Sequence, residues 1–347
     1  MSKPAGRRAA PRQPSRLDRA LGRLPGGRRV AWIVCGGLLG LSVVLLLLAL
    51  AGVGPTWFDG VGAVAATTAY SALLANRTGG RPLVFGALAL VCGIVVLIAD
   101  VAALRSGAAV MVTIISAVLA VLATRPAPRF RDAVLETMVA MSTAVLGALA
   151  AVGFRPELDV ARFGYLTIFL AFGLAFVLVY RLGAGLHGLG RRGLLLIAIG
   201  TLLVGIALAY GELLRRYGTP GLVQSVVDGF VWLDEHVGAA PQALMTVLGI
   251  PALVWGVHQR ARRRQGWWAC AYGVAATARP AYLVMRPEVS PLEALLAVAY
   301  SVVIGVLLGY LLIRVDLFVT GSTGRRSMRD QEAEPIRPEP SRTRPLL

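Results

Sequence analysis

The sequence predicts an all-α fold, a polytopic transmembrane helical bundle of about ten spans, on three observations. Hydrophobic residues form 56% of the 347 residues and charged residues only 15%, whereas a soluble domain is about a quarter charged. Apolar stretches near the length of about 20 residues that a spanning helix needs recur from Val30 to Ile313. Short loops that contain arginine separate these stretches, and no room is left for a separate soluble domain.

The chain divides into three parts around these spans. Residues 1–29 are a basic head without an apolar stripe at helical spacing. Residues 30–313 are the transmembrane domain, and residues 314–347 are a charged tail whose prolines forbid a continuous helix. The head and the tail are both expected to be disordered in the cytoplasm. The expected spans, in order, are 30–53, 60–75, 82–103, 107–124, 133–153, 163–181, 194–213, 240–258, 267–285 and 291–313.

The first two spans depart from the usual length. Residues 30–53 exceed the apolar core of about 7–15 residues of a cleaved signal peptide, so this span is expected to stay as an anchor. Residues 60–75 fall short of the usual minimum of about 17 residues, so neighbouring helices are expected to shield this span. The third span ends at Asp100, a boundary charge close to Arg105.

Small residues at a spacing of four are expected to let helices approach each other closely. Gly36 and Gly40 form such a pair in the first span, and Gly305 and Gly309 form one in the last. Both pairs are expected to pack within one bundle and not between two copies of the chain.

The long loop between the seventh and eighth spans predicts a surface helix. Thr219 and Pro220 form a cap and first-turn pair. Apolar residues follow at helical spacing: Val223, Val226, Val227, Phe230 and Leu233. An amphipathic helix is therefore expected over residues 219–237, lying on the outer membrane surface as a connector or as a lid over a site.

The placement of the basic residues predicts the orientation in the membrane. If the N-terminus is cytoplasmic, 28 of the 35 Lys and Arg lie in cytoplasmic segments and six lie in outer loops, while Arg279 falls inside a span. Cytoplasmic loops carry such an excess of Lys and Arg, so both termini are expected on the cytoplasmic side of the cell membrane. This topology accounts for the net charge of +17, and no nucleic-acid partner is expected.

A basic cluster precedes Trp267 and Trp268. At the edge of a span, arginines and tryptophans mainly fix topology, although such a cluster can also bind anionic lipid head groups. The lipid bilayer is thus the expected partner, and the sequence leaves protein partners open. The cluster consists of Arg260, Arg262, Arg263 and Arg264.

Motifs for most chemistry are missing from the sequence. Cys35, Cys92 and Cys270 each lie within a span, which predicts buried thiols and neither a disulfide set nor a zinc site. The three histidines are isolated, and no phosphate-binding loop, serine-hydrolase elbow or dinucleotide fingerprint occurs. No metal, no cofactor and no catalytic residue are therefore expected.

Arg279 is the first of three candidate substrate-binding residues, because an ionisable group at membrane depth is costly. It lies about 9 Å from the outer end of its span, at about 1.5 Å per residue, and Pro280 disturbs the helix beside it. A cation in a broken helix can bind an anionic group. Alternatively, Arg279 extends outwards to the surface or pairs with Glu288 or Glu293.

Glu136 and Glu293 are the other two candidates, because the segments around them align at a constant offset of 157 residues. The segments open the fifth and tenth spans, so equivalent helices would cross in opposite directions, as in a 5+5 inverted repeat of a secondary transporter. Alternatively, both glutamates only stabilise the starts of their helices. Leu135, Glu136, Ala140 and Val145 match Leu292, Glu293, Ala297 and Val302.

The leading functional hypothesis is a permease-like or flippase-like carrier of a small or lipid-linked anionic solute. Arg279 would bind the anionic group, and Glu136 and Glu293 would be proton-linked or gating carboxylates. A second hypothesis is a membrane-embedded enzyme that acts on a lipid-linked substrate from the outer face. Its acid or base would be one of Glu157, Asp159 and Asp228. The third hypothesis is a non-catalytic membrane subunit or scaffold whose head and tail dock cytoplasmic partners.

Overall fold

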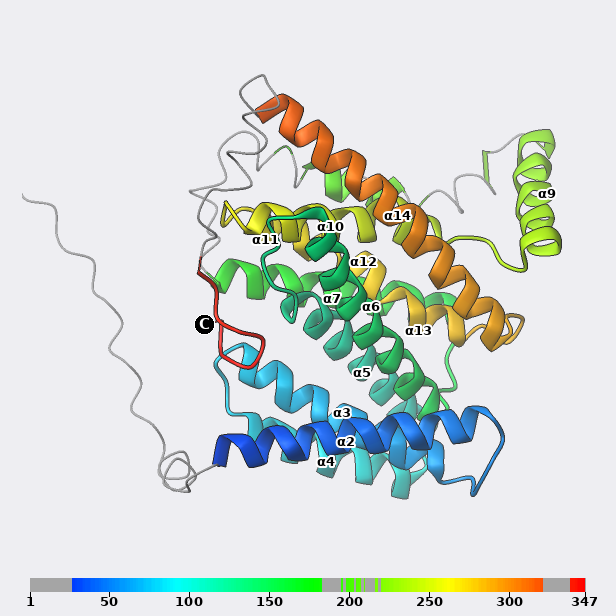
Figure 1. Cartoon of the computed structure of the whole chain (residues 1–347). Helices are drawn as coiled ribbons and strands as arrows, with labels where there is room; N and C mark the ends of the chain where they lie inside the picture. The colour runs from blue at the N-terminus through cyan, green and yellow to red at the C-terminus, as the bar shows by residue number, and fades with distance from the viewer. Residues whose placement is uncertain are drawn as a thin grey trace, which may run out of the picture.

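The computed structural model describes residues 27–182, 220–320 and 338–346, together with scattered positions between 195 and 217. Within these residues the chain is helical and contains no strand. Seven of the described helices are long and apolar enough to cross a membrane (Figure 1). They are α2 (Gly27–Leu50), α3 (Phe58–Arg77), α4 (Pro82–Ala99), α5 (Ala102–Leu122), α6 (Phe130–Gly153), α7 (Val160–Arg181) and α14 (Pro291–Thr320). The chain is thus an all-α bundle with apolar helices of membrane length, as predicted.

The first six predicted spans each coincide with one helix from α2 to α7. The short second span becomes a helix of 20 residues, and most of α3 is buried by its neighbours as expected. The fourth helix begins five residues earlier than predicted, at Ala102, because Asp100 takes a left-handed conformation with φ of 51° and ends α4. Asp100 forms an ion pair with Arg105, as a boundary charge would.

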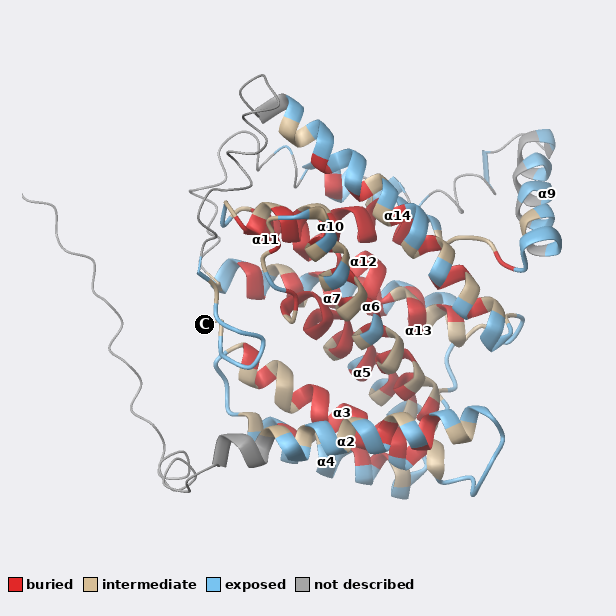
Figure 2. Cartoon of the chain, in the orientation of Figure 1, coloured by how far each residue is buried: buried red, intermediate tan, exposed pale blue. Residues whose placement is uncertain are grey.

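Three helices form a layer on one side of the bundle. The middle helix, α3, packs against both α2 and α4, and it also contacts α5 and α6. Burial follows this order, because α3 and α5 are largely buried whereas α2 and α4 are largely exposed (Figure 2). The exposed side chains on α2 and α4 include Ile33, Leu88 and Ile98. Broad apolar surfaces of this kind suit contact with lipid tails.

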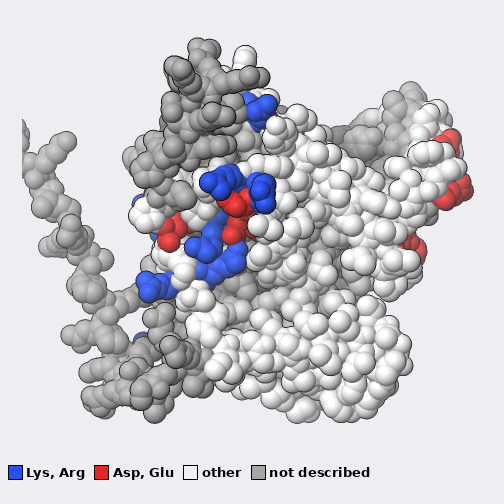
Figure 3. All heavy atoms as spheres, in the orientation of Figure 1, with Lys and Arg blue, Asp and Glu red and all other residues white. Residues whose placement is uncertain are grey.

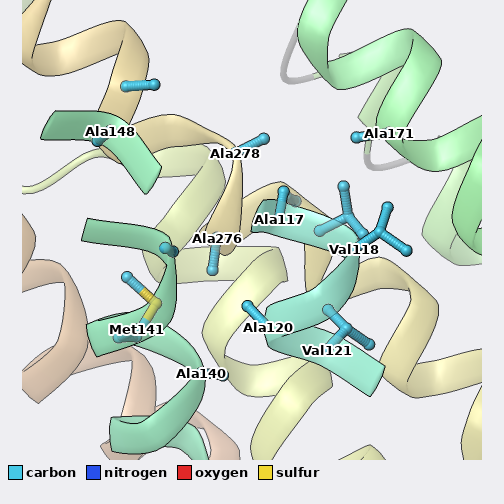
Figure 4. Close-up of a cluster of buried hydrophobic side chains, with 14 of the residues drawn as sticks. Ala117, Val118, Ala120, Val121, Ala140, Met141, Ala148, Ala171, Ala276 and Ala278 are labelled. Carbon is cyan, nitrogen blue, oxygen red and sulfur yellow. The ribbon is translucent and has the colours of Figure 1, made fainter. Parts of the chain in front are cut away.

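Small side chains form the centre of the bundle (Figure 4). A Cβ atom added to Gly249 would lie 2.2 Å from the backbone nitrogen of Ala276, so the chain segments approach each other closely there. Close contact through small residues is the usual packing mode of membrane helices. Alanines from α5, α6, α7 and α12 (Val274–Thr277) meet at the centre, each at most 1% exposed: Ala117, Ala120, Ala140, Ala148, Ala171 and Ala276.

The two predicted small-residue pairs differ in their surroundings. A Cβ atom added to Gly305 or Gly309 would lie within 2.8 Å of side chains of α10 (Ile250–Arg260). Nothing lies within 4 Å of the corresponding position at Gly36 or Gly40. The pair on α14 therefore packs within the bundle as predicted, whereas the pair on α2 does not.

Of the stretches expected to be continuous spans, 240–258 is a continuous helix that contains a π-helical segment, and 267–285 is a broken helix. The first consists of a π-helix, η2 (Leu244–Gly249), and α10, and the second consists of α11 (Gly266–Tyr272), α12 and α13 (Arg279–Val284). Glycine or proline stands near each break, and both residues weaken a helix. Residues 266–278 are all buried, which matters because irregular backbone at membrane depth is tolerated only inside protein or beside a cavity.

The long loop before η2 contains the amphipathic helix that was expected at 219–237. It is α9 (Pro220–Val237), and it stands away from the bundle in Figure 1. The hydroxyl of Tyr300 on α14 donates a hydrogen bond to the Val237 carbonyl at 2.9 Å, which ties the end of α9 to the bundle. Half of the seventh predicted span, 194–213, falls outside the described residues.

The charged tail differs from the disordered segment that was expected from residue 314. The last helix, α14, continues to Thr320, and residues 338–346 lie against the bundle where α3 and α10 end. We call residues 338–346 the C-terminal segment, this end of the bundle the tail end, and the opposite end, where α6 finishes, the far end. Residues 1–26 and 321–337 lie outside the described residues.

Candidate functional site

Arg279 begins α13 at the far end, in largely uncharged surroundings. Its guanidinium lies over the Tyr282 ring, with 4.0 Å between Cζ and the ring centroid, and its Nη2 donates to Oε1 of Gln242 at 3.4 Å. Its Nε is buried and has no hydrogen-bond partner within the described part of the chain. On α7, a Cβ added to Gly164 would lie 2.6 Å from the Tyr282 ring and 3.5 Å from Nη1 of Arg279. The absence of a side chain at Gly164 therefore makes room for the arginine and its ring.

Gln242 connects Arg279 to α14. The backbone N–H of Gln242 donates to Oγ of Ser301 at 2.8 Å, and Ser301 is fully buried on α14. The Ser301 hydroxyl in turn donates to the Ala297 carbonyl at 2.7 Å. Gln242, in the loop before η2, therefore links the guanidinium to α14, while Gly164 on α7 leaves room for it.

The two carboxylates that the sequence offers to Arg279 have other partners. Glu288 pairs with Arg286 at 3.5 Å. Glu293 accepts the Ser290 backbone N–H at 3.3 Å, and the Ser290 hydroxyl accepts the Glu293 backbone N–H at 3.1 Å, which is a capping box at the start of α14. Among the described residues, no carboxylate forms an ion pair with Arg279. Its charge is therefore not neutralised by an ion pair there.

Glu136 lies near the start of α6, at the tail end, and so not beside Arg279. Its Oε2 accepts the backbone N–H of Arg125 at 2.8 Å, and its Oε1 accepts a hydrogen bond from Nη2 of Arg342 at 2.5 Å. Because α6 runs from this end to the far end, the three predicted site residues do not form one cluster. Glu136 contacts the C-terminal segment, whereas Glu293 caps its own helix.

The C-terminal segment is held by two arginines whose role the sequence did not reveal. The first, Arg77, is 1% exposed, and its Nη1 donates to the carbonyls of Ser341 and Arg344 at 2.7 and 2.9 Å. The backbone carbonyl of Arg77 accepts the N–H of Leu346 at 2.8 Å. These bonds fix the last part of the segment across the end of α3.

The second, Arg260, belongs to the basic cluster that was expected to fix topology or to bind lipid. Its side chain is 0% exposed, and it pairs with Glu339 at 2.6 Å. It also donates to Oγ1 of Thr124 at 2.7 Å and lies over the Trp267 ring, 3.4 Å from the centroid. Arg260 is therefore not accessible to lipid head groups, whereas Arg263, which belongs to the same basic cluster, is exposed.

A cavity of about 340 Å³ lies beside these arginines, between α2, α3, α5, α6 and the C-terminal segment. Its polar lining comes from Tyr70, Arg77, Ser142, Thr143, Arg342 and Thr343. Its apolar lining comes from Trp32, Leu39, Leu73, Leu119, Ala123 and Leu146. The volume falls within the range of about 300–1,000 Å³ that is usual for small-molecule sites.

Arg77 gives the polar side of this cavity a positive charge. Its Nε donates to the Leu122 carbonyl at 2.8 Å, and its Nη2 has no partner among the residues that the structure describes. The two nearby carboxylates do not pair with Arg77, because Glu136 pairs with Arg342 and Glu339 pairs with Arg260. Figure 3 shows basic side chains gathered around acidic ones at this end, while most of the described surface in that view carries no charge.

Comparison with known proteins leaves geometry as the guide to function. No protein-family model, no curated protein and no solved structure matches this chain. Among the described residues, no group of three or more His, Cys, Asp or Glu side chains could hold a metal ion. The candidate sites are therefore Arg279 at the far end and the cavity beside Arg77 at the tail end.

Proposed function

We propose that the protein is a permease-like or flippase-like carrier of a small or lipid-linked anionic solute. The observation that carries the proposal is Arg279, a mostly buried cation that contacts an amide and an aromatic ring and that no described carboxylate neutralises. A buried charge without a partner is costly, so it is retained where it has a use. An anionic group of the solute would supply the missing partner.

The broken helices around Arg279 support a carrier. Discontinuous helices commonly form the substrate sites of secondary transporters, where the interruption exposes backbone groups to the solute. The stretch from α11 to α13 is broken in this way, and α13 begins at Arg279 itself. A structural membrane subunit has no comparable need for interrupted helices in the middle of its bundle.

The proposed topology has about ten spans in the cell membrane and both termini in the cytoplasm, so the tail end faces the cytoplasm. The gathering of Arg77, Arg125, Arg260 and Arg342 at the tail end supports this orientation.

The 5+5 inverted repeat belongs to the same proposal. In support of it, α6 and α14 run in opposite directions, because Phe130 at the start of α6 stacks edge-on with Tyr310 near the end of α14. In this scheme Glu136 and Glu293 are the gating or proton-linked carboxylates at the two ends. The contact between Glu136 and Arg342 gives the gating role a partner that can dissociate.

Neither alternative function gains a specific observation. Two of the carboxylates that an enzyme would use make local helix contacts: Asp159 caps α7 by accepting the Arg162 N–H at 2.8 Å, and Asp228 on α9 accepts a bond from Gln224 at 2.8 Å. A scaffold would use its tail to dock other proteins, whereas the described part of the tail contacts the bundle itself.

The test of this proposal is the thermal stability of the detergent-purified protein with a panel of anions. The panel comprises inorganic phosphate, dicarboxylates, sugar phosphates and polyprenyl phosphates. A bound ligand at about 100 times its Kd stabilises the folded state by about 2.7 kcal/mol, which raises the melting temperature. We expect at least one anion to do so in the native protein and in the control Arg286→Gln, and not in Arg279→Gln. An anion that stabilises all three proteins equally would remove Arg279 from the site.

A further inference from the structure

The cavity beside Arg77 combines a charged wall with apolar walls. Arg77 and the hydroxyls of Tyr70 and Thr143 lie on the polar side, and the Tyr70 hydroxyl donates to the Thr143 carbonyl at 2.9 Å. The apolar walls come from leucines on α2, α3, α5 and α6. A water-soluble anion would have no use for those leucines, whereas an amphiphile would contact both kinds of wall.

The charge of this cavity is not balanced by the residues that line it. Arg342 is paired with Glu136, whereas the hydrogen bonds of Arg77 go to three backbone carbonyls. Carbonyls satisfy donors but do not neutralise a full positive charge. The buried Nη2 of Arg77 still lacks a partner within the described chain. An anion in the cavity would therefore gain a charge-assisted interaction with Arg77.

The cavity opens on the side where α6 faces outwards from the bundle. Ser142 belongs to its lining and is exposed, while Leu39 and Leu146 beside it are half-buried. The neighbouring surface of α2 is apolar, with Leu41 49% exposed. A ligand can thus keep its apolar part at the lipid-facing surface while its charged part lies beside Arg77.

We propose that this cavity binds the phosphate-bearing head group of an anionic lipid from the leaflet at the tail end. The phosphate lies beside Arg77, and the acyl chains leave between α2 and α6 along Leu39 and Leu146. Basic pockets between membrane helices are general binding sites for such head groups. The site is separate from Arg279 and requires no transport, so it stands or fails independently of the proposed carrier function.

The experiment measures lipid binding to the full-length protein by native mass spectrometry in detergent. Phosphatidylglycerol, phosphatidylcholine and inorganic phosphate are compared as probes. Leu39→Trp replaces a leucine of the cavity wall with a larger side chain. Leu41→Trp is the matched control, since Leu41 lies on the same helix at an exposed position outside the cavity. A second cavity variant, Leu146→Trp on α6, guards against a local effect of α2.

We expect phosphatidylglycerol to bind the native protein and Leu41→Trp with the same affinity, and to bind Leu39→Trp and Leu146→Trp about ten-fold more weakly. Phosphatidylcholine, which carries no net charge, should bind all four proteins weakly. Equal binding of the two lipids, or equal phosphatidylglycerol binding by all four proteins, would overturn the proposal. Saturable binding of inorganic phosphate that Leu39→Trp and Leu146→Trp weaken, while neither variant weakens phosphatidylglycerol binding, would assign the site to free phosphate and overturn the lipid assignment. Arg77→Gln is not used alone, because Arg77 also holds the C-terminal segment.

Discussion

Arg77, Arg260 and Arg279 are largely removed from solvent, and their guanidinium groups differ in the partners that compensate the buried charge. Arg260 has a carboxylate, a hydroxyl and a ring, Arg77 has carbonyls, and Arg279 has one amide and one ring. The first arrangement is that of a structural ion pair, since every strong interaction of the charge is internal. The other two have no carboxylate partner among the described residues, and this difference separates the structural arginine from the candidate binding residues.

The structural role predicts a large effect for Arg260→Gln. Removal of this guanidinium leaves Glu339, only 8% exposed, without its partner, and breaking a buried pair in this way costs about 3–5 kcal/mol. We expect the melting temperature of the detergent-purified protein to fall steeply. The control Arg263→Gln changes an exposed arginine of the same loop and should alter stability by less than about 0.5 kcal/mol. Equal melting temperatures for the two variants would refute the structural assignment.

At the scale of helices, close contact through small residues decides where the chain bends. Gly249 meets the backbone of α12, so a Cβ there has no flexible side chain to displace. We expect Gly249→Ala to destabilise the protein by about 1–3 kcal/mol, as overpacking does. Gly173→Ala on α7 is the matched control, because nothing lies within 4 Å of its added Cβ, and alanine favours a helix by about 1 kcal/mol. Thermal unfolding of both variants tests this contrast, and a stabilised Gly249→Ala would contradict it.

The C-terminal segment is the second element whose attachment can be tested. Its ion pair between Arg342 and Glu136 is partly exposed, with side chains 39% and 13% exposed, so it contributes about 1 kcal/mol at most. We expect Glu136→Arg to speed hydrogen exchange at the Leu346 amide by about five-fold, because the segment detaches more often. The double variant Glu136→Arg/Arg342→Glu restores the pair with reversed charges and should restore protection. If the double variant exchanges as fast as the single one, this pair does not hold the segment.

At the scale of the whole molecule, local patterns predicted most of the long helices. Hydrophobic length located α2 to α7 and α14, and apolar spacing located α9, because membrane insertion and surface contact depend mainly on nearby residues. The disturbance of the helix beside Pro280 was predicted, whereas the break at Gly273 and the π-helical segment η2 were not. They depend on burial of that stretch by helices distant in sequence, and the hydropathy of the stretch does not record this burial.

The candidate site was predictable in the same limited way. Arg279 could be selected because a cation within an apolar stretch is rare. The cavity could not be selected, since it depends on contacts between Arg77 and Ser341 and between Arg260 and Glu339, which lie far apart in the sequence. A charged, proline-rich tail has the composition of a disordered segment, and its last residues are held by Arg77, Arg260 and Glu136, which the sequence does not place beside it.

The central claim, that an anion crosses the membrane through contact with Arg279, is tested most directly by flux in proteoliposomes. The probe is the anion from the panel that most raises the melting temperature, in radiolabelled form, and exchange is measured in native, Arg279→Gln and Arg286→Gln proteins. We predict saturable exchange by the native protein and by Arg286→Gln, and exchange at the level of empty liposomes for Arg279→Gln. No exchange by the native protein, or undiminished exchange by Arg279→Gln, would contradict the account.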